Sequence, residues 1–199
     1  MAINKVVNLD ENSAAYKSIM REMEKMRDED LVIVARSEKN RKNDSVKPIE
    51  VKNGIYFYVA YDAHNFTAFI PSPTPEKIYI AKANMIRRAR LGGMFEIMDG
   101  EGTAIDDYTP DEMMNVITLD SKKYGAGLLG CREFIKAISD KFGKCYILPS
   151  SIHELIVVPA DTTTKNNLLA MVKEINATKV SENEFLADAV YTVNDWILR

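Results

Sequence analysis

Apolar positions in the first third of the chain change between helical and extended spacing. Over residues 11–28, apolar side chains recur at three- and four-residue steps, which predicts an amphipathic surface helix. The run LVIVA (31–35) is wholly apolar and typical of a short buried strand. Segments 54–61 and 66–70 are rich in β-branched and aromatic residues on either side of a turn-like DAHN, so we expect a hairpin there.

A second helix is predicted after the PSPTP segment. Thr74 is a suitable N-cap and Pro75 suits the first helical position, where no backbone N–H is needed. We expect this helix to run to Gly92-Gly93, where glycine accepts the left-handed cap conformation. Residues 96–112 then contain seven carboxylates and no basic residue, which indicates a loop region and the boundary between two halves.

The C-terminal half shows the clearest succession of strands and helices. Its order is β-α-β-β-α-(short α)-β, in which a Ser181–Glu184 capping box opens the short helix. This order predicts an α+β fold, a mostly antiparallel sheet with helices, and it is compatible with a ferredoxin-like layer. The predicted strands are 113–119, 144–149, 152–159 and 189–193, and the long helices are 131–142 and 162–177.

One strand of this half lacks the alternation of a half-exposed sheet. Leu155 and Val157 lie on one face of the predicted strand, and Ile156 and Val158 on the other, so both faces are apolar. An antiparallel strand with one solvated face alternates with polar residues. We therefore expect a sheet covered on both sides, with the N-terminal half as a cover. This favours a single integrated α+β domain over residues 1–199; the alternative is a subdivision into 1–95 and 112–199.

Composition and charge exclude several classes of protein. The net charge is −3, which gives no electrostatic case for binding nucleic acid or an anionic membrane. The longest apolar run, 55–61, is far short of the ~20 residues needed to cross a bilayer. The two cysteines, Cys131 and Cys145, suit free thiols in a reducing compartment, so we expect a cytoplasmic protein. No cofactor motif and no metal-ligand spacing is visible, so we expect no cofactor and no metal.

The segment PSSIHE (149–154) carries the most suggestive chemistry. A strand over residues 152–158 would turn His153 and Glu154 to opposite faces, which prevents them from acting as a dyad. Ser150 and Ser151 then stabilise a turn by bonding their own backbone. In the functional alternative, the turn presents both serines and His153 to a ligand or partner, because histidine titrates near neutral pH.

Other signals favour structural roles. YGAGLLG (124–130) places three glycines before a helix but matches no phosphate-binding motif, so a packing or turn role is predicted. Cys131 falls on the apolar stripe of the following helix, which indicates a buried thiol. The acidic loop lacks the spacing of a calcium loop and is interpreted as solvated. The basic IRRAR segment (86–90) is interpreted as a solvated helix end.

Three segments of the C-terminal half occur in a distinctive order: Tyr124-Gly125-Ala126, then Leu148–Glu154 (LPSSIHE), then Glu174–Tyr191. In order and spacing they resemble the C-terminal region of the bacterial domain-of-unknown-function family number 5688, over about 80 residues. Ala187-Asp188 stands where this family often has Ser-Asp. The order of elements is also loosely similar to the YtpQ-like proteins. No enzymatic activity is assigned to this family, so the resemblance indicates none for this chain. It implies an accessory role in gut bacteria, their phages or other mobile elements.

Two functional hypotheses remain. The first is a non-enzymatic interaction or regulatory protein that binds a protein partner or a second copy of itself. The alternative is a small hydrolase-like enzyme in which His153 is the general base and Ser150 or Ser151 the nucleophile. The candidate binding residues are Ser150, Ser151, His153, Glu154 and Tyr124. Nucleic-acid binding through Arg87, Arg88 and Arg90 is the least favoured because the net charge is negative.

Overall fold

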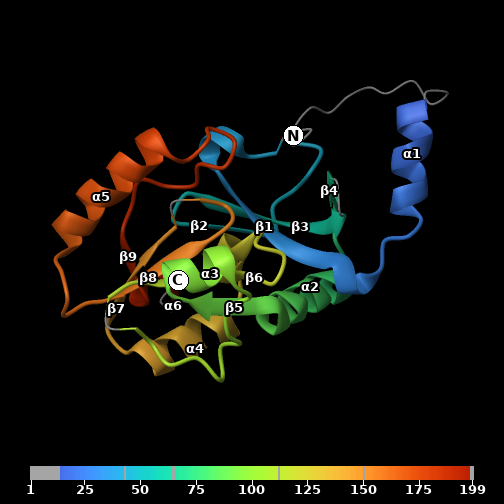
Figure 1. The fold of residues 1–199 in the computed structure, drawn as a ribbon. Coiled ribbons are helices and arrows are strands. Elements are labelled where there is room, and N and C mark those ends of the chain that lie inside the picture. The colour runs from blue at the N-terminus through green and yellow to red at the C-terminus, as the bar shows by residue number, and fades with distance from the viewer. Residues whose placement is uncertain (1–13, 43, 64–65, 112, 150, 198–199) are drawn as a thin grey trace.

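The fold is α+β, as the sequence predicts, and contains two antiparallel sheets (Figure 1). The structure is a computed structural model that describes residues 14–42, 44–63, 66–111, 113–149 and 151–197. In the first sheet the long central strand β3 pairs with β1 along one edge, and with β2 and β4 in turn along the other. The bounds are β1 Leu31–Ser37, β2 Glu50–Lys52, β3 Ile55–Ala63 and β4 Phe66–Phe69. The predicted buried strand and hairpin are both confirmed.

The second sheet combines the predicted C-terminal strands with one from the N-terminal half. Its order is β5-β6-β8-β7-β9 and every pairing is antiparallel. The ferredoxin-like order is not confirmed. The strands are β5 Ala89–Gly92, β6 Asn115–Leu119, β7 Cys145–Leu148, β8 Leu155–Pro159 and β9 Tyr191–Thr192.

The helices follow the predicted apolar spacing. Thr74 caps the second helix by accepting a hydrogen bond from the Lys77 backbone N–H at 3.3 Å, as expected. The α-helices are α1 Ala14–Met23, α2 Pro75–Arg88, α3 Met94–Asp99, α4 Arg132–Phe142, α5 Lys165–Thr178 and α6 Asn194–Ile197. Short 3-10 helices are η1 Asp28–Asp30, η2 Glu38–Asn40 and η3 Gly125–Gly130. No helix among the described residues is both long enough and apolar enough to cross a bilayer.

The predicted end of α2 at Gly92-Gly93 is wrong. The helix ends at Arg88, and residues 89–92 form β5, which pairs with β6. Ala89 and Leu91 are buried while Arg90 is half-buried, the two-residue alternation of a strand. The basic segment is also not a simple solvated helix end, because Arg88 pairs with Asp62 at 3.5 Å and with Asp120 at 2.9 Å.

Two further expectations need correction. The acidic segment 96–112 is not loop throughout, because α3 extends into it as far as Asp99. The predicted short helix after Ser181 is a turn, in which the backbone N–H groups of Glu184 and Phe185 both donate to the Ser181 carbonyl.

The second sheet is covered on both faces, as the apolar pattern of β8 predicts. Leu155 and Val157 belong to a large core cluster that contains residues of both halves of the chain. Ile156 and Val158 belong to a smaller cluster with Leu168 and other residues from α5. Figure 1 shows α5 on one side of this sheet and the first sheet with α2 on the other. The N-terminal half therefore covers one face only, and α5 covers the second.

The segment η3 lies wholly buried between the sheets, which confirms the packing role predicted for YGAGLLG. A Cβ atom on Gly127 would collide with the carbonyl group of Ile33 in β1. A Cβ on Gly125 would lie 2.6 Å from the carbonyl oxygen of His153. These glycines allow the backbone of η3 to approach both neighbouring segments closely, and this approach brings Tyr124 to the His153 turn.

Candidate functional site

The three sequence segments of the C-terminal half meet around His153. The Gly125 N–H donates to the His153 carbonyl at 2.9 Å, and the Ile152 N–H donates to the Glu184 carbonyl at 2.9 Å. Ser151 and Phe185 form an isolated antiparallel bridge. Three segments that are distant in sequence are thus joined through backbone hydrogen bonds, and we call this the His153 cluster: Tyr124, Ser151, His153, Glu154 and Glu184.

The imidazole of His153 is engaged on both sides. Its Nδ1 accepts a hydrogen bond from the Tyr124 N–H at 3.4 Å, and its Nε2 lies 3.4 Å from a carboxylate oxygen of Glu184. Because Nδ1 accepts, we assign the ring proton to Nε2, facing Glu184. Burial lowers the pKa of His153 below its ordinary value, and the Glu184 carboxylate opposes this shift. The ring therefore joins the η3 turn to the 181–185 turn in its neutral form.

Ser151 supports the turn and does not face the imidazole. Its side chain is buried, and its Oγ accepts a hydrogen bond from the backbone N–H of His153 at 3.0 Å. This is the local backbone bond that the sequence predicts for the structural interpretation. Ser150 lies outside the described residues.

Glu154 does not pair with its neighbour, but the predicted reason is wrong. The strand β8 begins at Leu155, so His153 and Glu154 precede it in a bend and strand alternation does not apply. The carboxylate beside the imidazole is that of Glu184, a residue far away in sequence. Burial raises the pKa of Glu154, and the charge of Glu184 adds to the rise.

Tyr124 lies at the junction of the two sheets. Its backbone is left-handed, with a φ of 60°, which places the residue at the start of η3. Its hydroxyl is hydrogen-bonded to the Thr67 hydroxyl in β4. Burial raises the pKa of Tyr124, so the phenol stays neutral near pH 7.

Arg36 and Asn40 connect this cluster to the first sheet. A terminal nitrogen of Arg36 donates to the Asn183 carbonyl at 3.1 Å, and the Asn40 amide donates to the Glu182 carbonyl at 2.6 Å. Arg36 is 5% exposed, which is unusual for a charged residue. The 181–185 turn is therefore fixed from the N-terminal half as well as from the His153 turn.

Comparison with protein-family models gives a match to a family of unknown function, DUF5688, over residues 2–194. The chain belongs to this family. No curated protein and no solved structure matches it.

The DUF5688 match extends well beyond the C-terminal segments that suggested it. It spans nearly the whole chain, including β1 and the loop after it, and so includes Arg36 and Asn40. The looser similarity to the YtpQ-like proteins stays a prediction.

Sequence reasoning missed Arg36 and Glu184 as parts of the site. Arg36 had a usable signal, since it is a charged residue directly after the apolar run LVIVA of a buried strand. Glu184 had none, because it stands in a polar segment of ordinary composition and reaches the site through a turn.

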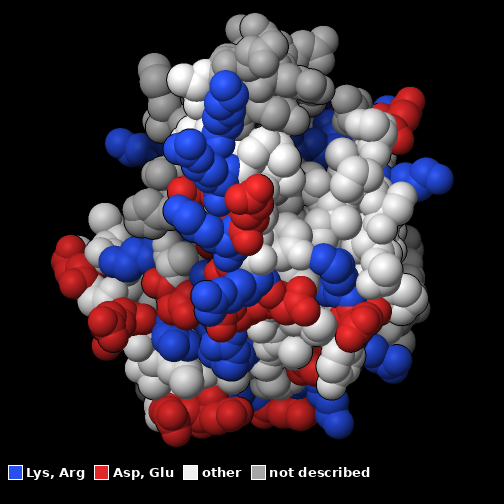
Figure 2. All heavy atoms as spheres, turned by 90° about the vertical axis from the view of Figure 1, so that its right-hand side faces the viewer, with Lys and Arg blue, Asp and Glu red and all other residues white. Residues whose placement is uncertain are grey.

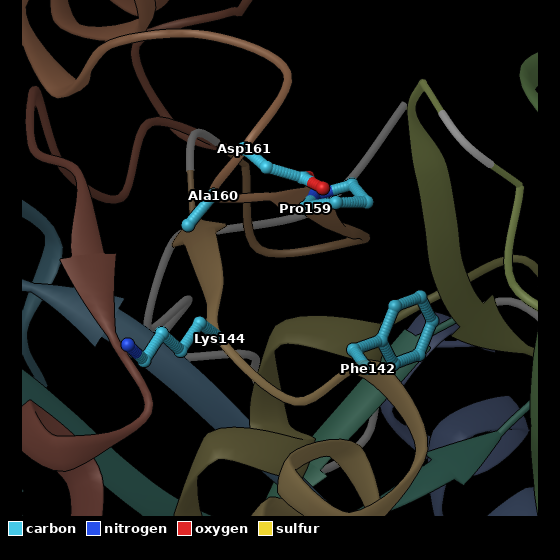
Figure 3. A pocket seen from close by; sticks show the side chains of 5 residues that line it. All are labelled: Phe142, Lys144, Pro159, Ala160 and Asp161. Atoms are coloured by element: carbon cyan, nitrogen blue, oxygen red, sulfur yellow. The ribbon is translucent and has the colours of Figure 1, made fainter.

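A separate cavity lies at the other end of β8. It has a volume of about 420 Å³ and is lined by Phe142, Lys144, Pro159, Ala160 and Asp161 (Figure 3). None of the predicted binding residues that the structure describes lines it. Figure 3 shows Phe142 and Pro159 on opposite sides of the hollow.

The two cysteines and the potential metal ligands offer no further site among the described residues. Cys131 is buried, and burial raises its thiol pKa to about 12 and that of Cys145 to about 11. No group of three or more potential metal ligands occurs within the part of the chain that the structure describes.

Proposed function

We propose that this DUF5688 protein is a non-enzymatic interaction protein that associates with a second copy of itself. In the proposed contact, the apolar face of α1 in one copy packs on an exposed apolar surface beside α3 in the other. We call the latter the α3 surface: Met94, Phe95, Met98 and Met113. The observation that carries the proposal is the 80% exposure of Phe95.

The helix α1 is short and stands apart from the rest of the fold. It has 10 residues and projects to the right in Figure 1. Met20 and Met23 on its apolar stripe are 38% and 44% exposed, and no described α1 residue belongs to either core cluster. A helix of this length is marginal in water without tertiary packing. A partner that covers the methionine stripe would therefore stabilise it.

The α3 surface is an apolar patch of the kind that marks protein–protein contacts. Met98 is 66% exposed and Met113 is 75% exposed, while Ile97 is buried beneath them. Met113 lies two residues before the N-terminal end of β6, which pairs with the end of β5 that leads into α3, so these side chains lie near one end of the sheet. Methionine and aromatic residues are favoured at such contacts because they adapt to the partner.

The charges around the two surfaces are complementary. Lys17, Arg21 and Lys25 follow one another at four-residue steps along α1 and the turn after it, and Figure 2 shows a band of basic side chains on this side of the molecule. Exposed carboxylates follow one another in the sequence of α3 and the segment after it, and none of those described forms an ion pair: Glu96, Asp99, Glu101, Asp106, Asp107 and Asp111. Because Lys25 pairs with Glu22 at 2.8 Å, Lys17 and Arg21 are the basic residues of α1 that suit this acidic, apolar surface.

The contact is expected between copies because one chain does not cover its own patch. Figure 1 shows α1 and α3 well apart, and Phe95 remains exposed in the single chain. A single helix docked on a small patch buries less than a standard interface, so we expect dissociation constants on the order of micromolar or weaker.

The hydrolase alternative lacks a described nucleophile. The Ser151 hydroxyl bonds backbone, and both nitrogens of the His153 ring face other groups. A hydrolase needs a hydroxyl within hydrogen-bond reach of the base. The geometry thus favours the interaction hypothesis.

Sedimentation velocity over a range of concentrations tests the proposal. The wild-type chain should show concentration-dependent association, and Phe95→Glu should abolish it. Tyr79→Glu is the matched control, because Tyr79 is 75% exposed on α2, away from both surfaces. A wild-type chain that stays monomeric at hundreds of micromolar would refute the proposal, and so would equal effects of the two substitutions.

A further inference from the structure

Two cations share one aromatic ring beside the His153 cluster. The guanidinium carbon of Arg36 lies 5.7 Å from the centre of the Phe69 ring, and the Lys42 ammonium lies 4.0 Å from it. Register places Arg36 and Phe69 on the same face of the first sheet, since Val34 pairs with Tyr58 and Ala60 with Phe69. Both charges are thus collected at one place on this face.

The positions of the two cations are fixed by the surrounding structure. The backbone N–H of Lys42 donates to the Tyr58 hydroxyl at 3.1 Å, and the Tyr58 ring meets Phe69 edge-on at 5.9 Å. Arg36 is fixed in turn by its bond to the Asn183 carbonyl. The arrangement is therefore a built framework and not a pair of solvated side chains.

No acid forms an ion pair with either cation among the described residues, although the charge of Glu184 acts on Arg36 from beyond ion-pair distance. The Nε atom of Arg36 is buried and has no hydrogen-bond partner in the described structure. A buried donor on a charged group costs free energy when it is left unpaired. An acceptor with negative charge is the group that this site lacks.

The acid–base properties of Lys42 agree with this deficit. Burial and the charge of Arg36 lower the pKa of Lys42 to about 8. Burial also lowers the pKa of Arg36, but its guanidinium remains protonated at neutral pH. The site thus disfavours its second positive charge because Lys42 is partly buried beside Arg36 and no described carboxylate pairs with it.

We infer that Arg36 and Lys42 form a binding site for an oxyanion, the carboxylate or phosphate group of a small ligand. The planar guanidinium suits such a group through paired N–H donors, and the ammonium adds a point charge. The half-buried ring of Phe69 offers an apolar contact for the rest of the ligand, and the buried ring of Tyr58 supports it edge-on. This site is independent of the proposed α1–α3 contact.

The neighbouring titratable groups define what a pH experiment measures. Tyr58 and Tyr124 have raised pKa values and stay neutral, and the carboxylate of Glu184 faces the imidazole of His153. Glu38 and Arg41 pair with each other at 3.2 Å, and Asp62 pairs with Arg88. Lys42 is therefore the group whose charge changes between pH 7 and 9.

Calorimetric titration with inorganic phosphate and with citrate, at ionic strength held constant with sodium chloride, tests the inference. At least one anion should bind saturably at pH 7, and the one that does identifies the oxyanion class. Lys42→Met keeps an apolar side chain over Phe69 and should weaken binding at least tenfold. Lys47→Met, an exposed lysine of the same loop, should leave it unchanged.

The pH dependence gives a second readout. For citrate, which is fully ionised above pH 7, affinity should fall about tenfold from pH 7 to pH 9 as Lys42 loses its proton. Arg36→Met, checked for folding by circular dichroism, should also abolish saturable binding. No saturable binding of either anion, or equal binding by the two lysine variants, would overturn the inference. Affinity that is constant to pH 9 would overturn it as well.

Discussion

The His153 cluster and the α1 and α3 surfaces differ in how many of their side chains have a contact partner within the single chain. In the cluster, backbone and side-chain bonds link three distant segments, and His153 has a partner on each side. On the surfaces, large apolar side chains such as Phe95 face solvent, and the exposed carboxylates of residues 96–111 form no described ion pair. The recognisable sequence segments thus lie where the fold is held together, while the unsatisfied groups lie elsewhere.

This difference separates what identifies the family from what we propose it does. Tyr124, Ser151 and His153 have structural roles that account for their residue types. Phe95 and Met98 have no such role within one chain. Substitutions in the cluster should therefore act on stability, and substitutions on the surfaces should act on association.

The largest effect is expected at Gly127. Gly127→Ala would drive a Cβ into the Ile33 carbonyl and within 2.9 Å of the Met85 methyl group. Because the backbone of Ile33 cannot move aside without a large energetic cost, we expect a loss of about 3 kcal/mol or more in the free energy of unfolding. Urea denaturation followed by circular dichroism measures it. Gly93→Ala, whose Cβ would lie 3.9 Å from its nearest neighbour, is the control and should cost less than about 1 kcal/mol.

A smaller loss is expected at His153. His153→Ala removes the contacts to Tyr124 and Glu184 and leaves the Tyr124 N–H without its acceptor. We expect a cost of about 1–2 kcal/mol in the same measurement. Unchanged stability would show that His153 does not stabilise the fold. That result would favour the alternative in which His153 is a catalytic base.

The pH dependence of stability sharpens the role of His153. Its pKa is lowered in the folded chain, so the unfolded chain binds more protons between that pKa and the ordinary 6.5. The free energy of unfolding should therefore fall as the pH is lowered through this window. Glu154, whose pKa is raised, contributes with the opposite sign, so the test is the difference between wild type and His153→Gln. A wild-type profile parallel to that of the variant would contradict the account.

The smallest stability effect is expected on the surface. Met98→Glu places a charge on a side chain that is 66% exposed in the single chain. We expect a change within about 0.5 kcal/mol in the monomer, together with weaker association. Denaturation at low protein concentration separates the first effect from the second. A large loss of monomer stability would show that the Met98 side chain stabilises the single chain despite its exposure.

The sequence was sufficient for most of the elements and insufficient for the site. Apolar spacing predicted β1, the hairpin of β3 and β4, the Thr74 cap and the two-sided burial of β8. It failed at residues 89–92, where a helical pattern continued but pairing with β6 prevailed. The contacts of His153 with Tyr124 and Glu184, and of Arg36 with Asn183, depend on segments distant in sequence that meet in space, and local sequence carries no signal for these partners.

The most direct test of the central claim is a mixing experiment by sedimentation velocity. Met23→Glu disables the α1 face and Phe95→Glu disables the α3 surface, so each variant alone should remain monomeric. An equimolar mixture retains one intact α1–α3 contact and should associate, more weakly than wild type if wild type forms two such contacts. A mixture that stays monomeric at concentrations where wild type associates would contradict the proposed contact.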